Sequence, residues 1–306
     1  MKSKPISIVI FSAAALLFGF LFATDWFSKP VPWQRATGWD SIPEDLRPAS
    51  RISSPDIRWL GHAGILVTWH NTKVLFDPNL SSRCAVVKRH MQAPVKASDL
   101  PAIDAVAISH AHFDHLDNPT LEGIAQIGTV ITPKGTDDYL SQQVKERTVV
   151  HGLKLGESQQ IGPLEITAVP AVHKGGRYHP FPSRYFAVGY ILRDDTSAIY
   201  FAGDTAYGEH FKKIAELYHP RLALLPIGGY LPRFPLKYHH LSPEEAVEAA
   251  SVLKVKSVIP IHFGTFRIAF DRPASALPLF ARAARAAGVS WEMPQLISRK
   301  DVTDPL

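Results

Sequence analysis

Cysteine is almost absent from this sequence. The 306 residues include a single cysteine, Cys84. One thiol forms no disulfide within the chain, and it excludes sites in which two or more cysteines bind zinc. We therefore expect neither a disulfide framework nor a zinc finger. Cys84 is predicted to be a small structural residue, with a free reactive thiol as the alternative.

The chain also has only a small excess of positive over negative charge. Charged residues make up 20% of the chain, and the formal net charge is only +5. The sequence contains no long Lys/Arg run and no recognisable nucleic-acid-binding module, so we expect no nucleic-acid partner. The small positive excess favours an anionic surface such as that of phospholipid headgroups. No repeat of 20–50 residues is present, which argues against a solenoid or a propeller.

Long apolar runs are confined to the N-terminus. Lys2 and Lys4 precede an uncharged, mostly apolar run over residues 6–23, which Asp25 ends. The run is just long enough to span a bilayer, and small residues do not occupy both positions before a cleavage point. We predict a membrane anchor over residues 1–25, with a cleaved signal segment as the alternative. The positive end would face the cytoplasm, which places the rest of the chain outside it, on the periplasmic side of a bacterium.

The remainder divides into an arm and one folded domain. Residues 26–56 are rich in Pro, Trp and Ser and show no clear period, which predicts a linker and extended arm. From residue 57 to residue 306, strand patterns come first and then alternate with helical ones. The clearest helix start is Ser242, with Pro243 next and Glu245 three residues on. This order predicts an α/β domain built as a sandwich of two mixed sheets flanked by helices.

Four metal-binding side chains lie within six positions of one another: His110, His112, Asp114 and His115. The apolar run at 105–108 precedes them and is typical of a buried strand, so the four groups are expected in a loop at its end. Imidazoles at positions i and i+2 can converge on one ion. The other two groups then point elsewhere and can hold a second ion. Imidazole combined with carboxylate suits Zn²⁺ or a close relative.

Three further candidate ligands follow apolar runs later in the chain: His173, Asp204 and His262. Each is predicted at the carboxyl end of a strand, where a sheet presents its site. A lone histidine such as His173 is more often a satisfied core or surface residue. The three residues gain weight because they complete a set with the cluster at 110–115.

The order HxHxDH, then His, then Gly-Asp, then His resembles the metallo-β-lactamase fold superfamily over residues 57–269. The resemblance implies the αββα sandwich of that superfamily and two Zn²⁺ per chain. One metal would be held by His110, His112 and His173, the second by Asp114, His115 and His262, and Asp204 would bridge the two. Asp114 and Asp204 thereby belong to the catalytic centre. A metal pair of this kind activates water and stabilises developing charge. Asp117 and Thr205 are candidate acceptors for the ring nitrogens that face away from the metals.

Other segments narrow the resemblance. The turn at 61–64 resembles the branch of the superfamily that includes the ascorbate-phosphate lactonases and the N-acylphosphatidylethanolamine-hydrolysing phospholipase D family. The segments 226–233 and 237–246 are more similar to the phospholipase family. The resemblance implies a membrane-associated phosphodiesterase with a phospholipid substrate, which releases N-acylethanolamine and phosphatidic acid. His240 matches a histidine that lies near the metals in that family. It is expected to position the phosphate or to help protonate the leaving group, with a supporting role as the alternative.

Aromatic and basic side chains outside the ligand set are the predicted substrate contacts: Tyr230, Arg233, Arg177 and Arg184. Arg177 and Arg184 lie in the stretch 174–185, which departs from the phospholipase pattern. They are expected to meet phosphate, or alternatively to be solvated. A lactonase or another ring-opening hydrolase of the same fold is the second enzymatic interpretation. A non-enzymatic interpretation is a membrane-tethered binding or scaffold protein with a residual metal site. The intact ligand set argues against it.

Overall fold

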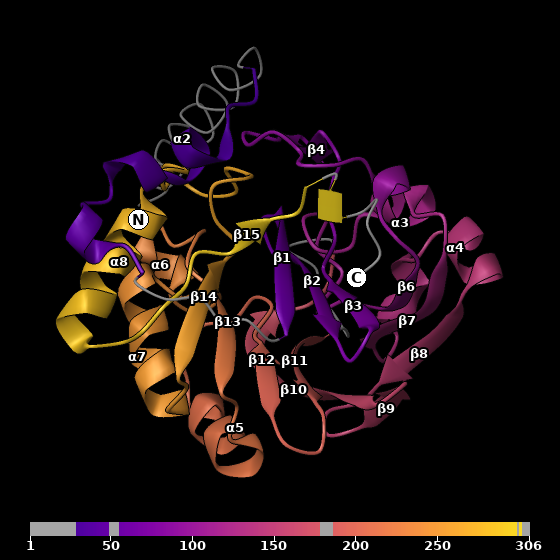
Figure 1. Cartoon of the computed structure of the whole chain (residues 1–306). Coiled ribbons are helices and arrows are strands. Elements are labelled where there is room, and N and C mark those ends of the chain that lie inside the picture. The colour runs from indigo at the N-terminus through magenta and orange to yellow at the C-terminus, as the bar shows by residue number, and fades with distance from the viewer. Residues whose placement is uncertain (1–28, 49–54, 178–185, 299, 302–306) are drawn as a thin grey trace, which may run out of the picture.

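The computed structural model describes residues 29–48, 55–177, 186–298 and 300–301, and Figure 1 traces their path. The strands are β1 (Asp56–Gly61), β2 (Gly64–Trp69), β3 (Thr72–Phe76), β4 (Arg83–Cys84), β5 (Val87–Lys88), β6 (Ile103–Ala107), β7 (Ile127–Pro133), β8 (Val149–Leu153), β9 (Ser158–Ile161), β10 (Leu164–Lys174), β11 (Phe186–Arg193), β12 (Ala198–Phe201), β13 (Leu222–Pro226), β14 (Ser257–Ile261) and β15 (Gln295–Leu296). The α-helices are α2 (Trp33–Thr37), α3 (Asn118–Gly123), α4 (Gln142–Arg147), α5 (His210–Tyr218), α6 (Arg233–Leu236), α7 (Pro243–Leu253) and α8 (Ala276–Ala287). Short 3-10 turns lie at Trp39–Ser41, Glu44–Leu46, Ala97–Asp99 and Thr136–Tyr139.

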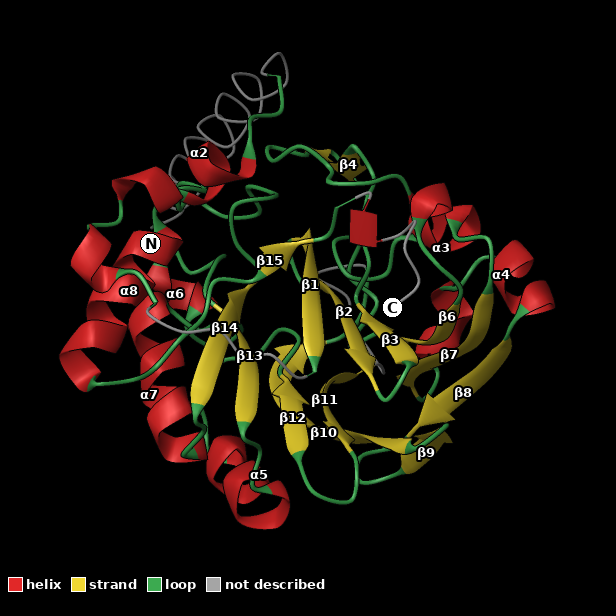
Figure 2. Ribbon diagram, in the orientation of Figure 1, coloured by secondary structure: helices red, strands yellow, loops and turns green. Residues whose placement is uncertain are grey.

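Two mixed sheets form the centre of the molecule. The first has the order β15-β1-β2-β3-β6-β7-β8, and the second has the order β14-β13-β12-β11-β10-β9. Figure 2 shows helices on the two outer sides, with α5, α7 and α8 beside the second sheet and α3 and α4 beside the first. The predicted α/β sandwich of two mixed sheets flanked by helices is therefore confirmed.

Alternation along the strands explains the layers, because successive side chains of a strand point to opposite faces. On β2, Val67 belongs to the core between the sheets, whereas Leu66 belongs to the smaller core that contains Leu121 of α3. Phe76 of the first sheet stacks on Phe201 of the second, with ring centroids 4.7 Å apart. Both faces of the first sheet are thus buried, and the loops at the strand ends are held on a rigid base.

The N-terminal arm is only partly described. Within residues 29–48, Ala36 and Ile42 are buried in the larger core, and Val31 pairs with Met91. The arm residues therefore contact the domain, whereas the predicted boundaries at 26 and 56 remain a prediction.

The predicted membrane anchor, residues 1–25 with the apolar run 6–23, lies outside the described residues. In the described part of the chain, no helix combines the length and the apolar composition needed to cross a bilayer. The expectation of a membrane-anchored protein with its hydrolase domain outside the cytoplasm is corrected by this finding.

Candidate metal centre

The first predicted ligand group comes together at the end of β6. The loop after this strand carries His110 and His112, while His173 lies near the end of β10, inside the strand rather than after it. His112 Nδ1 lies 2.8 Å from His110 Nε2 and 3.2 Å from His173 Nε2. Asp204 Oδ2 lies 3.9 Å from His110 Nε2 and 3.8 Å from His173 Nε2. Three imidazoles and one carboxylate therefore point at a common centre.

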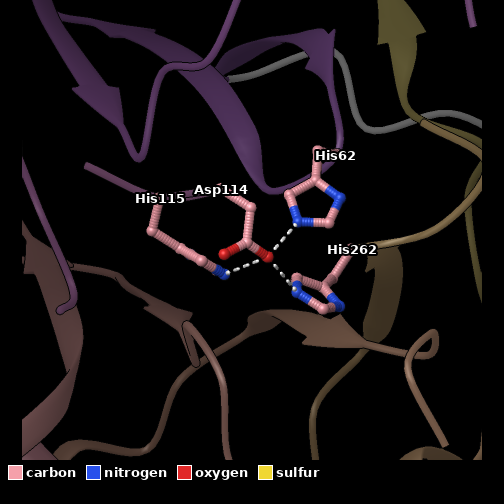
Figure 3. Close-up of side chains that lie close together, drawn as sticks. All are labelled: His62, Asp114, His115 and His262. Atoms are coloured by element: carbon pink, nitrogen blue, oxygen red, sulfur yellow. Dashed lines mark hydrogen bonds and ion pairs between the residues drawn. The ribbon is translucent and has the colours of Figure 1, made fainter. Parts of the chain in front are cut away.

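The second predicted group faces the other side of the same aspartate. Asp204 Oδ2 lies 3.3 Å from His115 Nε2, and its Oδ1 lies 3.1 Å from His262 Nε2. Asp114 Oδ2 lies 3.4 Å from His262 Nε2 and 3.6 Å from His115 Nε2. Figure 3 shows the Asp114 carboxylate between the rings of His115, His262 and His62. Asp204 thus lies between two ligand groups.

The geometry fits metal ions. A tetrahedral zinc site with bonds of about 2.0–2.1 Å places its ligand atoms about 3.3 Å apart. Most of the separations in the two groups lie close to that value. The ligand atoms His115 Nε2, His262 Nε2 and Asp204 Oδ1 are buried and have no hydrogen-bond partner among the described residues. Burying such atoms without a partner costs free energy, and a metal ion provides the missing partner.

Electrostatics support the same assignment. Burial raises the pKa of the Asp204 carboxyl, but the neighbouring His262, His115 and His240 outweigh burial and hold the pKa well below its usual value. Burial lowers the pKa of His110 well below its usual value, so this ring is neutral and offers a lone pair. An ionised carboxylate and neutral imidazoles are the forms that bind metal. In the second group, burial lowers the pKa of His262, but Asp204 and Asp114 outweigh burial and raise it to about 9. An ion that binds there therefore displaces a proton from this ring.

Asp77, at the end of β3, orients two ligands and is fully buried. Its Oδ2 accepts hydrogen bonds from His115 Nδ1 and from the Ser109 hydroxyl, both at 2.6 Å. The same hydroxyl lies 2.9 Å from His110 Nδ1. Such contacts fix the tautomer and the ring orientation of a metal ligand. Asp117, which sequence reasoning nominated for this role, instead caps helix α3 by accepting from the Thr120 backbone.

A cavity of about 430 Å³ opens onto the ligand groups. Its polar part is formed by His112, Asp114, His173, Asp204, His239, His240 and Lys174, and its remaining wall by Cys84, Ala85, Val87, Phe113, Leu236 and Ile268. Burial raises the pKa of the Cys84 thiol well above its usual value, so this wall residue is neutral. The cavity therefore joins a metal-binding floor to a largely apolar wall.

His240 lies at the edge of the metal-binding groups. Its Nδ1 is 3.7 Å from Asp204 Oδ2 and has no hydrogen-bond partner among the described residues. Burial lowers the pKa of His240 to about 4. A neutral imidazole thus faces the cavity where a substrate would meet the metals.

The predicted substrate contacts lie elsewhere. Arg233 Nη2 pairs with Glu245 at 2.6 Å, and its Nη1 donates to the His240 carbonyl at 3.2 Å. Arg177 donates to two carbonyls of the loop after β6, and the buried Tyr230 has its hydroxyl 3.2 Å from that of Ser275. None of these three lines the cavity. Arg184 lies outside the described residues.

Sequence reasoning missed four residues at this site: His62, Asp77, Lys174 and His239. Asp77 carried a usable signal, because it follows an apolar strand as Asp204 does. His173 Nδ1 donates to the His239 carbonyl at 2.8 Å. This contact could not be predicted from residue type, because every residue has a backbone carbonyl. The side chain of His62 lies 2.8 Å from Asp114. His62 stands alone in a short turn, so it has no regular sequence spacing from the predicted ligands that could have indicated this contact.

Comparisons with known proteins agree with the fold and with metal-dependent hydrolysis. Residues 72–263 match the beta-lactamase superfamily domain. N-acyl-phosphatidylethanolamine-hydrolyzing phospholipase D 1 of Caenorhabditis elegans is 31% identical over 263 residues, which cover 76% of this chain and 74% of that protein. A UPF0173 metal-dependent hydrolase of Methanoregula boonei is 33% identical over 224 residues, which cover 70% and 85%. Igni18, a metallo hydrolase from Ignicoccus hospitalis, matches in fold with a TM-score of 0.59 at 22% identity, covering 79% of this chain and 94% of Igni18.

The matched region contains the strands from β3 to β14. Six of the seven predicted ligands lie well inside it, and His262 lies near its end. The chain therefore belongs to the beta-lactamase superfamily domain family, and it is a metal-dependent hydrolase with the metallo-β-lactamase fold.

Proposed function

We propose that this chain is a binuclear zinc phosphodiesterase that hydrolyses phospholipids of the N-acylphosphatidylethanolamine type. The products are an N-acylethanolamine and phosphatidic acid, and residues 57–306 form the hydrolase domain. The observation that carries the proposal is the cavity, because its floor of metal ligands meets a wall built from Val87, Phe113, Leu236 and Ile268. A diacyl phosphodiester has a matching division into an anionic centre and apolar chains.

Each part of the floor has a separate task in this reaction. Bound zinc supplies the Lewis acidity that activates water at neutral pH and stabilises negative charge on the reacting phosphate. Water oxygen forms a bond to phosphorus, the bond from phosphorus to the ethanolamine oxygen breaks, and the proton that the water gives up ends on that ethanolamine oxygen. The carboxylate of Asp204 offsets the positive charge of the centre. The Nδ1 of His240, which has no hydrogen-bond partner in the described part of the chain, is assigned the hydrogen bond that orients a phosphoryl oxygen.

Two neighbouring residues support this arrangement. Arg233, with its contact to the His240 carbonyl, holds the segment that carries His240. Lys174 lines the cavity directly after the ligand His173 and provides a cation for the phosphate. The relative from Caenorhabditis elegans, whose name states hydrolysis of N-acyl-phosphatidylethanolamine, gives the proposal its substrate.

The test is a direct assay. The zinc-supplemented chain is mixed with N-acylphosphatidylethanolamine in detergent micelles, and mass spectrometry follows N-acylethanolamine and phosphatidic acid. A panel of lactones is assayed in parallel, and Asp204→Asn serves as the inactive control. The proposal predicts release of both lipid products by the unmodified chain alone. Ring opening of a lactone without release from any phospholipid would replace the proposal with the lactonase alternative.

A further inference from the structure

We propose that His62 is a positioning residue for the second metal: its side chain holds Asp114, and its backbone holds His262. The residue lies in the turn between β1 and β2, far in sequence from both ligands. The inference rests on the two-metal centre of the proposed function, although its test reads metal affinity and needs no substrate.

The side chain of His62 meets Asp114 at hydrogen-bond distance. His62 Nε2 lies 2.8 Å from Asp114 Oδ2, closer than the ligand nitrogens of His115 and His262 lie to the same oxygen. An ionised carboxylate only accepts hydrogen bonds, so His62 Nε2 carries the hydrogen and donates it. A nitrogen that donates a hydrogen bond has no lone pair to offer a metal. His62 therefore orients Asp114 and does not join it as a ligand.

The backbone of His62 acts on the other ligand. Its carbonyl accepts a hydrogen bond from the His262 backbone N–H at 2.9 Å and another from Trp59 Nε1 at 2.8 Å. Its own N–H donates to the Thr265 hydroxyl at 2.6 Å. The imidazole also packs against the His262 ring, with centroids 4.1 Å apart. One residue of the β1–β2 turn thus connects ligands that come from the loops after β6 and β14.

The turn keeps a histidine where the backbone favours glycine. His62 has a φ of 54°, in the left-handed region that a side chain with a Cβ atom rarely adopts. Its side chain is nearly fully buried, at 1% exposure. Residues held in such conformations cluster at functional sites, where the surrounding contacts maintain them. Here the contacts that maintain the conformation are the same ones that reach Asp114 and His262.

The experiment compares His62→Gly, His62→Ala and His62→Gln in the full chain. His62→Gly removes the imidazole and keeps the left-handed turn, and His62→Gln restores an N–H donor. The matched control is His70→Gly, because His70 has a similar φ of 50° in the next hairpin turn and an exposed side chain. Metal-free protein is titrated with Co²⁺ against a competing chelator, and the visible absorption bands are recorded. Circular dichroism checks the fold of each variant.

We expect His62→Gly and His62→Ala to bind the second Co²⁺ equivalent about 10–100-fold more weakly, with the first equivalent unchanged. His62→Gln should recover part of the loss, with the absorption bands of the unmodified chain. Unchanged affinity in His62→Gly would overturn the inference. So would bands in all three variants that report the loss of a nitrogen ligand, because His62 would then bind the metal directly. If the unmodified chain bound no Co²⁺, the proposed function itself would fail.

Discussion

At the scale of single residues, Asp204 has the most connections in the centre. One oxygen faces His115 and the other faces His262, and the first is also directed toward the group around His110. Replacing the carboxylate by an amide keeps the shape and removes the negative charge between the two ligand groups. Such a change separates the requirement for charge from the requirement for packing.

We therefore expect Asp204→Asn, which removes the ligand's negative charge, and His112→Ala, which removes a ligand outright, to lower the rate of hydrolysis by at least about 100-fold. Loss of a supporting contact alone already costs about 10–100-fold. Circular dichroism should stay unchanged, because neither side chain packs in the apolar core. His70→Ala is the control, as it removes an exposed histidine from the β2–β3 turn. Near-normal turnover in either ligand variant would contradict the binuclear centre.

Asp77 should affect metal binding indirectly, through the ligands that it orients. Asp77→Asn weakens the acceptor for His115 Nδ1 and for the Ser109 hydroxyl. We expect metal affinity to fall about 10–100-fold, and excess zinc to restore much of the activity. The exposed Asp195→Asn, in the turn after β11, should behave like the unmodified chain. An equal metal affinity for both variants would show that Asp77 has no part in orienting the ligands.

At the scale of elements, helix α7 shows how local chemistry places part of the site. Ser242 caps it by accepting from the Glu245 backbone, and the Glu245 side chain returns the contact and also pairs with Arg233. The predicted helix start at Ser242 and Pro243 is confirmed. It could be predicted from the sequence because all of its contacts form within one helical turn. Arg233 contacts the His240 carbonyl and pairs with Glu245, which lies twelve residues away. No local sequence pattern predicts a contact over that separation.

The cap has a measurable consequence. Ser242→Ala leaves a backbone N–H without its acceptor and should lower the free energy of unfolding by about 1 kcal/mol. Ser251→Ala, an exposed position near the end of the same helix, should change it far less. Urea unfolding followed by circular dichroism measures both. Equal effects would show that the capping contact contributes nothing beyond helix propensity.

At the scale of the whole molecule, the sheets bring together residues that are up to 200 positions apart. His62, Asp114, Asp204 and His262 come from separate strand ends that the two-sheet topology gathers at one edge. The sequence predicted the layers, because they depend on strand periodicity. The structure brings the seven candidate ligands together, and their role as ligands stays a prediction. The sequence did not predict His62 or Lys174, because their roles depend on which loops meet in space. The membrane location was wrong, because no helix in the described part of the chain is long and apolar enough to cross a bilayer.

The same assembly predicts that metal stabilises the fold. Buried ligand atoms lose their partner when metal is removed, and each ion present at about 100 times its Kd stabilises the native state by about 3 kcal/mol. Treatment with a chelator should therefore lower Tm by roughly 5–10 °C for a domain of this size. Adding zinc back should restore it. Asp204→Asn should show a smaller response to the chelator, and an identical Tm with and without chelator in the unmodified chain would argue against bound metal.

The central claim is that the two ligand groups sharing Asp204 hold two ions. Elemental analysis of the chain, purified with zinc supplementation and without chelator, tests it most directly. We expect close to two equivalents of zinc per chain in the unmodified protein. A value near zero in that preparation would contradict the metal centre and every role built on it.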